Sequence, residues 1–147
     1  MTTNGQEPPG PLRQAQLMRQ IAEAVGTEAR GDWSSARLVT AMTAGVIGAT
    51  NFVTVDGQET ETFPSTTAVE NAAKLRDLMY EPGKGTWYTM TMVVTREGTA
   101  DTDFDYDSEP TFVSIPVGDQ AFVDDARIFP RDDDHTPDWL RGKLQGR

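Results

Sequence analysis

Apolar and polar positions in the first third of the chain follow two different periods. In residues 11–25, apolar side chains recur at steps of three and four, with polar side chains between them, which is typical of an amphipathic helix. Gly26 is expected to end this helix. The next segment is rich in Val and Thr, and its Asp56-Gly57 pair predicts a tight hairpin turn. We therefore expect three strands here, at residues 34–43, 46–55 and 58–63.

The later helical segments are marked by the residues that begin them. Thr67 and Glu70 form a capping-box pattern shortly after Pro64, and apolar residues continue at helical spacing to about Tyr80. Residues of N-cap and first-turn type occur again near the C-terminus. We expect two more helices there, over residues 119–128 with Asp119 as the N-cap, and from Thr136-Pro137 onward.

Strict alternation of side-chain character predicts a second hairpin. Over residues 87–95 the alternation is typical of a strand, with Tyr88 and Met90 on one face and Trp87 on the other. After a turn, residues 99–107 return as its partner strand. Hairpins and helices in this order predict an α+β fold, a single domain with an antiparallel sheet of two hairpins flanked by helices.

The length of 147 residues suits one domain, which can bury roughly 70% of its unfolded surface without a disulfide or metal. Residues 1–10 are polar and contain Gly and a Pro pair, so we expect a disordered N-terminal arm, with the domain over residues 11–147. The chain has no Cys. It also lacks a signal-peptide pattern and any apolar run of about 18 residues, so a cytoplasmic protein without membrane contact is expected.

The net charge of −10 comes from one quarter of the chain. Between Asp101 and Asp138 there are eleven Asp and one Glu against Arg127 and Arg131, whereas the remaining residues are neutral in sum. A field of this sign repels nucleic acid and anionic lipid and attracts basic partners. We therefore expect a basic partner, and we expect no nucleic-acid partner.

The segment DTDFDYDSEP, residues 101–110, is the strongest local feature. In a strand, its four aspartates form a ladder on one face, at Asp101, Asp103, Asp105 and Asp107. Asp disfavours strands, and like charges about 7 Å apart repel one another, so stability alone does not favour this pattern. Two interpretations remain open, an edge strand protected from aggregation and an acidic docking surface. A calcium loop fails in every register, because its Gly and Glu positions are not met.

A second acidic segment precedes the last helix. It contains Asp132, Asp133 and Asp134, followed by His135, which is the only histidine. A serine triad lacks its G-x-S-x-G element, and neither a metal site nor a cofactor motif is present. We expect no catalytic residues, and we expect partner contacts at the ladder, at Glu109 and at Asp132–Asp134. A solvated loop at this second segment is the alternative.

The C-terminal half resembles the YezG-like immunity proteins of bacterial polymorphic toxin systems. The resemblance covers roughly residues 85–142. It is carried by Trp87-Tyr88, Phe104-Asp105-Tyr106-Asp107, Glu109-Pro110, Phe122, Phe129-Pro130-Arg131 and Pro137-Asp138-Trp139-Leu140.

The resemblance implies an antitoxin that binds and neutralises a cognate secreted toxin domain, often a nuclease, in the cytoplasm. Such a protein is not an enzyme, and the family offers no catalytic residues. A secretion chaperone or adaptor and a small acidic enzyme are the competing hypotheses. A free strand edge is compatible with a monomer or with a weak dimer.

Overall fold

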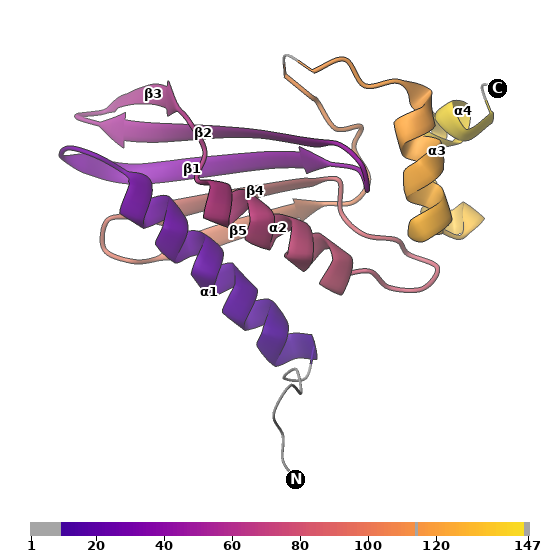
Figure 1. The fold of residues 1–147 in the computed structure, drawn as a ribbon, viewed down its shortest axis with the longest axis horizontal. Helices are drawn as coiled ribbons and strands as arrows, with labels where there is room; N and C mark the ends of the chain where they lie inside the picture. The colour runs from indigo at the N-terminus through magenta and orange to yellow at the C-terminus, as the bar shows by residue number, and fades with distance from the viewer. Residues whose placement is uncertain (1–9, 114, 146–147) are drawn as a thin grey trace, which may run out of the picture.

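A computed structural model describes residues 10–113 and 115–145 and confirms the α+β class (Figure 1). The chain forms a long helix, three strands, a second helix, two strands and a group of short helices. Their bounds are α1 Gly10–Glu28, β1 Trp33–Met42, β2 Ile47–Val55, β3 Gln58–Thr62, α2 Thr66–Leu78, β4 Thr89–Thr95, β5 Ala100–Asp105, α3 Asp119–Ile128, the 3-10 turn η1 Asp133–His135 and α4 Asp138–Gln145.

The five strands form one antiparallel sheet in the order β3-β2-β1-β4-β5. The β1–β2–β3 meander and the β4–β5 hairpin meet at the centre of the sheet. There β1 pairs with β4 across the α2 connection, with Leu38 opposite Met92. The Asp56-Gly57 turn closes the β2–β3 hairpin as predicted, with φ of 52° and 78° at its two residues. Consequently β3 and β5 are the two edges of the sheet.

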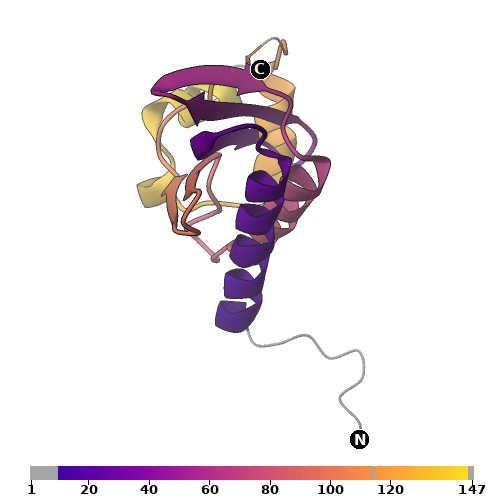
Figure 2. The ribbon, with the colours of Figure 1, turned by 90° about the vertical axis from the view of Figure 1, so that its left-hand side faces the viewer.

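One face of the sheet is covered by α1 and α2, which lie side by side on it (Figure 2). The alternation in β1 and β4 turns Leu38, Met90 and Met92 toward these helices, where each is fully buried. Leu17 and Ile21 of α1 meet them at helical spacing. The alternate buried residues of the strands therefore pack against the apolar stripe of the helices, and together they form the main core.

α3 and α4 lie beyond one end of the strands (Figure 1). They enclose a smaller apolar cluster built on Tyr88, Phe122 and Leu140. Trp139 packs edge-on against two of these, with ring centroids 5.4 Å from Tyr88 and 5.7 Å from Phe122. The end of the sheet is therefore held to the C-terminal helices by aromatic packing.

Two predicted helix boundaries are wrong. α1 continues through Gly26 to Glu28, since a helical glycine costs only roughly 1 kcal/mol and does not by itself end a helix. α2 is not capped by Thr67. Ser65 is its N-cap, with its hydroxyl accepting a hydrogen bond from the Ala68 amide at 3.1 Å.

The prediction that Tyr88 shares a face with Met90 is also wrong. β4 begins at Thr89, so the alternation does not extend back to the two preceding residues. Trp87 joins Met90 in the main core, and Tyr88 turns into the C-terminal cluster. At α3, Gly118 rather than Asp119 occupies the N-cap position. The predicted N-terminal arm lies outside the described residues except for Gly10, which begins α1.

Candidate functional site

The second face of the sheet, which we call the open face, is not covered by any helix of the described residues (Figures 1 and 2). Direct cross-strand partners share a face, so the register places Asp103 beside Thr91 and Asp101 beside Val93 on this side. Thr91 in turn pairs with Val39 at the centre of the sheet. The aspartates of β5 therefore border a surface of hydroxyl and small apolar side chains.

The predicted ladder is shorter than four residues. Asp101 and Asp103 are exposed and form no ion pair within the described residues. The strand ends at Asp105, whose carboxylate accepts hydrogen bonds from the Ser108 amide at 2.9 Å and the Asp107 amide at 3.0 Å. These bonds, that from Ser108 foremost, hold the pKa of Asp105 below its ordinary value. Asp105 thus ends the strand by capping its own turn.

Asp107 lies beyond the strand rather than in it, which corrects the predicted ladder, and Glu109 follows it. The Trp139 indole donates a hydrogen bond to the Asp107 carbonyl at 2.7 Å, leaving the Asp107 side chain exposed. The carboxylate of Glu109 is paired with Lys143 at 3.2 Å. Of the two carboxylates, that of Asp107 is available to a partner without the loss of an existing ion pair.

The second acidic segment is brought next to the first. Arg131 donates hydrogen bonds to the carbonyls of Tyr106 at 2.8 Å, Thr86 at 2.9 Å and His135 at 2.9 Å. Its charge is therefore satisfied by backbone carbonyls, while the following exposed carboxylates have no cation within ion-pair distance among the described residues. These are Asp132, Asp133 and Asp134. The Arg131 hydrogen bond to the Tyr106 carbonyl places the start of the second acidic segment beside the residues that follow β5.

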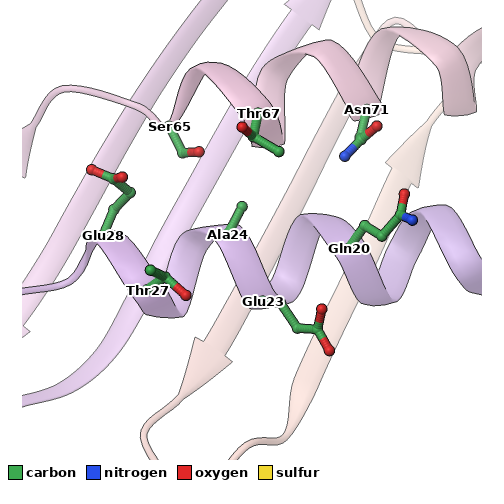
Figure 3. A pocket seen from close by; sticks show the side chains of 8 residues that line it. All are labelled: Gln20, Glu23, Ala24, Thr27, Glu28, Ser65, Thr67 and Asn71. Carbon is green, nitrogen blue, oxygen red and sulfur yellow. The ribbon is translucent and has the colours of Figure 1, made fainter.

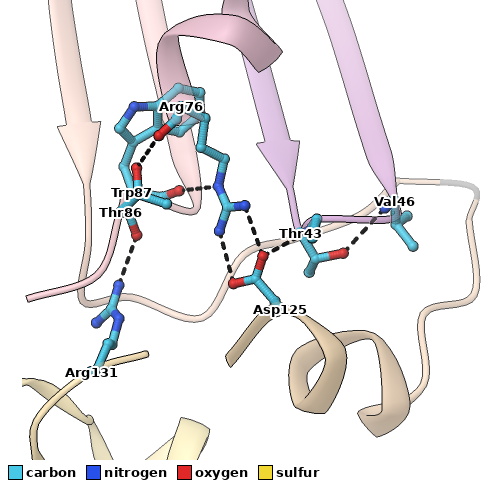
Figure 4. Close-up of polar contacts among 8 residues, drawn as sticks. Thr43, Val46, Arg76, Thr86, Trp87, Asp125 and Arg131 are labelled. Carbon is cyan, nitrogen blue, oxygen red and sulfur yellow. Dashed lines mark hydrogen bonds and ion pairs between the residues drawn. The ribbon is translucent and has the colours of Figure 1, made fainter. Parts of the chain in front are cut away.

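A buried ion pair fixes the position of α3, and sequence reasoning missed it. Arg76 of α2 and Asp125 of α3 form two hydrogen bonds of 2.8 and 3.0 Å, with both side chains 3% exposed. Arg76 also donates to the Trp87 carbonyl, and Asp125 accepts from the Ala44 amide at 2.6 Å (Figure 4). Asp125 is the one acid of the predicted acidic quarter that is fully buried.

Tyr88 lies between two guanidinium groups in this region. Arg131 is 5.0 Å and Arg76 is 5.3 Å from its ring centroid. Burial, helped by the Asp125 carboxylate and opposed by the two guanidiniums, raises the pKa of Tyr88 to about 12. The ring therefore stays neutral at physiological pH and serves as a packing surface for cations.

A polar hollow between α1 and α2 lies on the opposite side of the molecule from the open face (Figure 3). Its volume is about 500 Å³, and it is lined by Gln20, Glu23, Ala24, Thr27, Glu28, Ser65, Thr67 and Asn71. Ser65 is occupied in capping α2. Within the described residues, no three His, Asp or Glu side chains converge as metal ligands, here or on the acidic surface.

No protein-family model matches the chain, and no curated protein matches it. Among the described residues, no helix is both long and apolar enough to cross a membrane. The geometry of the site is therefore the basis for a functional proposal.

Proposed function

We propose that this protein is a cytoplasmic immunity protein that binds and neutralises a basic toxin domain, such as a nuclease or nucleotide-targeting toxin. The observation that carries the proposal is a set of exposed carboxylates that form no ion pair among the described residues. They are Asp101 and Asp103 on β5 and Asp107, Asp132, Asp133 and Asp134 beside its end. The proposal agrees with the family resemblance of the C-terminal half.

Unpaired carboxylates support capture of a basic protein for a physical reason. A charge already held in an internal ion pair contributes little to the outer field, whereas a free one attracts an oppositely charged partner over about a Debye length. Exposed carboxylates also present to a basic cleft the negative charge that phosphates would present. Such complementarity raises the association rate and selects the partner more than it sets the lifetime of the complex.

The first test is co-expression with the product of the gene adjacent to this one. We expect a complex that co-purifies, restores growth and weakens as salt rises. A complex that forms while the partner keeps its activity would instead indicate a secretion chaperone. No complex and no rescue would remove the immunity proposal for that pair.

The second test measures association kinetics with two charge-matched variants. Asp101→Asn with Asp103→Asn should slow association roughly tenfold at low salt, because steering of this kind accounts for factors of ten or more. Glu70→Gln with Asp77→Asn removes the same charge from exposed positions on α2, on the other side of the sheet, and should change the rate little. If both variants associate at the same rate, the β5 aspartates do not steer the partner, and protection of the sheet edge from aggregation is the remaining interpretation.

A further inference from the structure

The open face carries its acidic charges only along its two margins. On the β3 margin, Glu61 pairs with Phe52 of β2. Glu59, two residues earlier in β3, is on the same face and pairs with Thr54. On the other are Asp101, Asp103 and Asp105 of β5. The three strands between them contribute small, hydroxyl and apolar side chains, with Arg37 as the exception. At one end of the face Ala41 is buried and Phe112 of the β5–α3 connection lies against Gly48, so the exposed centre is formed by residues such as Arg37, Val39 and Thr91.

Among the described residues of β1, β2 and β4, the one cation on this face is already neutralised. The Arg37 guanidinium makes two contacts of 2.9 Å with the Glu59 carboxylate and lies 4.3 Å above the Phe52 ring. Beside it is a groove of about 290 Å³ with Val39 and Thr50 among its lining residues, and Val113 of the β5–α3 connection also lines it. Val113 is 63% exposed. The middle of the face is therefore neutral and partly apolar.

We propose that the open face binds a basic amphipathic α-helix of the partner, laid along the strands with its apolar stripe over β1 and its Lys or Arg residues over both acidic margins. This inference rests on the proposed function and names the element by which the partner is recognised. The occupant follows from charge complementarity, since a neutral, partly apolar centre between the β5 aspartates and Glu61 of β3 matches an apolar stripe flanked by basic residues.

The width of the face fits one helix. Strands lie about 4.8 Å apart, so the margins at β3 and β5 are about 19 Å apart. A helix with its side chains is about 10–12 Å across and covers the three central strands. Lys and Arg carry their charges at the ends of long stems, which places those charges over the margins rather than over the centre. Another β-sheet would present a flat surface, without an apolar centre flanked by long basic side chains, and so would match the open face less well.

The spacing along the strands fits as well. Alternate residues of a strand are about 7 Å apart, which sets the separation of Asp101 from Asp103. Residues four apart on a helix are about 6 Å apart along its axis. Basic residues at i and i+4 on one flank can therefore face successive aspartates.

Two other occupants fit the face less well. A second copy of this chain would bring acidic margins against acidic margins, which is unfavourable. A basic strand added to the edge of β5 would meet Asp101 and Asp103 but would not reach Glu61 on the far edge. The contribution of Glu61 therefore separates helix docking from strand addition.

The test uses two synthetic 18-residue peptides of identical Leu and Lys composition. One has helical periodicity with Lys on both flanks, and the other alternates Leu and Lys as a strand does. Binding to the full chain is followed at low salt by fluorescence anisotropy and by amide chemical shifts. We expect the helical peptide to bind at least tenfold more tightly and to shift amides of β1, β2 and β4.

The variants test the location. Val39→Lys, and independently Thr91→Lys, should weaken binding of the helical peptide at least tenfold, and Glu61→Gln and Asp103→Asn should each weaken it severalfold. Glu70→Gln on α2 is the charge-matched control and should have no effect. Thermal melts establish that each variant folds. Equal binding of both peptides, or no effect of Glu61→Gln and Val39→Lys, would overturn the helix site.

The same variants separate this inference from the proposed function. If Val39→Lys and Thr91→Lys leave the toxin complex intact, the helix site is wrong and the immunity proposal stands. If the unaltered protein forms no complex with the toxin, the immunity proposal fails whatever the peptides do. If both variants disrupt the toxin complex and Glu70→Gln does not, the helix site is supported.

Discussion

Removing the Asp125 carboxylate should be the most damaging single change at the C-terminal end of the fold. In Asp125→Ala, the Arg76 guanidinium stays buried without its counter-charge and the Ala44 amide loses its acceptor. Breaking a buried pair from one side costs about 3–5 kcal/mol. Alanine's higher helix propensity returns about 0.6 kcal/mol. The expected net loss is therefore about 3 kcal/mol in the free energy of unfolding.

That loss converts to a shift in melting temperature. With an unfolding entropy of about 2.1 cal/mol/K per residue, a chain of 147 residues has about 0.3 kcal/mol/K in total. The expected fall in Tm is thus about 10 °C. Equilibrium urea unfolding, followed by circular dichroism, gives the same quantity as a lower midpoint at an unchanged slope.

The neighbouring residue supplies a matched control. Asp124 is exposed on the same helix, and its carboxylate lies 3.4 Å from the guanidinium of Arg127, three residues later. Such a surface pair contributes little, so Asp124→Ala should stay within about 0.5 kcal/mol of the unaltered protein. The double variant Arg76→Met with Asp125→Leu has no buried charge and should lose less than Asp125→Ala. Equal losses for Asp124→Ala and Asp125→Ala would refute the assigned role of the ion pair.

Two further predictions concern pH. The pKa of Asp105 is lowered in the folded state, so its stabilising effect is present above the unfolded pKa and is lost as pH falls through the folded one. Asp105→Asn should therefore flatten the loss of stability on acidification, measured as Tm against pH; an unchanged profile would contradict this. The raised pKa of Tyr88 has the opposite sign, with stability lost as pH rises from about 10 to about 12. Tyr88→Phe should flatten that alkaline loss and remove one ionisation near pH 12 from an absorbance titration.

Local patterns in the sequence predict most elements of the fold, because each depends on neighbouring residues. The Asp56-Gly57 turn fixes one hairpin, and alternation marks the strands of the other. The central pairing of β1 with β4 has no such local signal. It joins Leu38 to Met92 across a helix, and it follows from the need to bury both strands under α1 and α2.

The buried ion pair shows where sequence reasoning failed at the site. In the sequence Asp125 is one acid among many, and its partner Arg76 is 49 residues away. A helical projection contains the missing information, since Asp125 lies three residues after the buried Phe122 and four before Phe129. An acid on the apolar stripe of a helix requires a buried cation. The sequence prediction considered only the total charge of residues 101–138 and so overlooked that Asp125 lies on the apolar side of its helix.

Net charge also overstates what the acidic quarter can offer a partner, because it does not distinguish how each acid is used. Of its twelve acids, all within the described residues, Asp125 is buried, Asp105 caps a turn and four are held in ion pairs. Six carboxylates remain: two lie on β5, that of Asp107 lies just beyond it, and three lie in the segment that follows Arg131. The hydrogen bond from Arg131 to the Tyr106 carbonyl places the start of the second segment beside the end of the first. Their shared location is what favours a partner-binding surface over a solvated face.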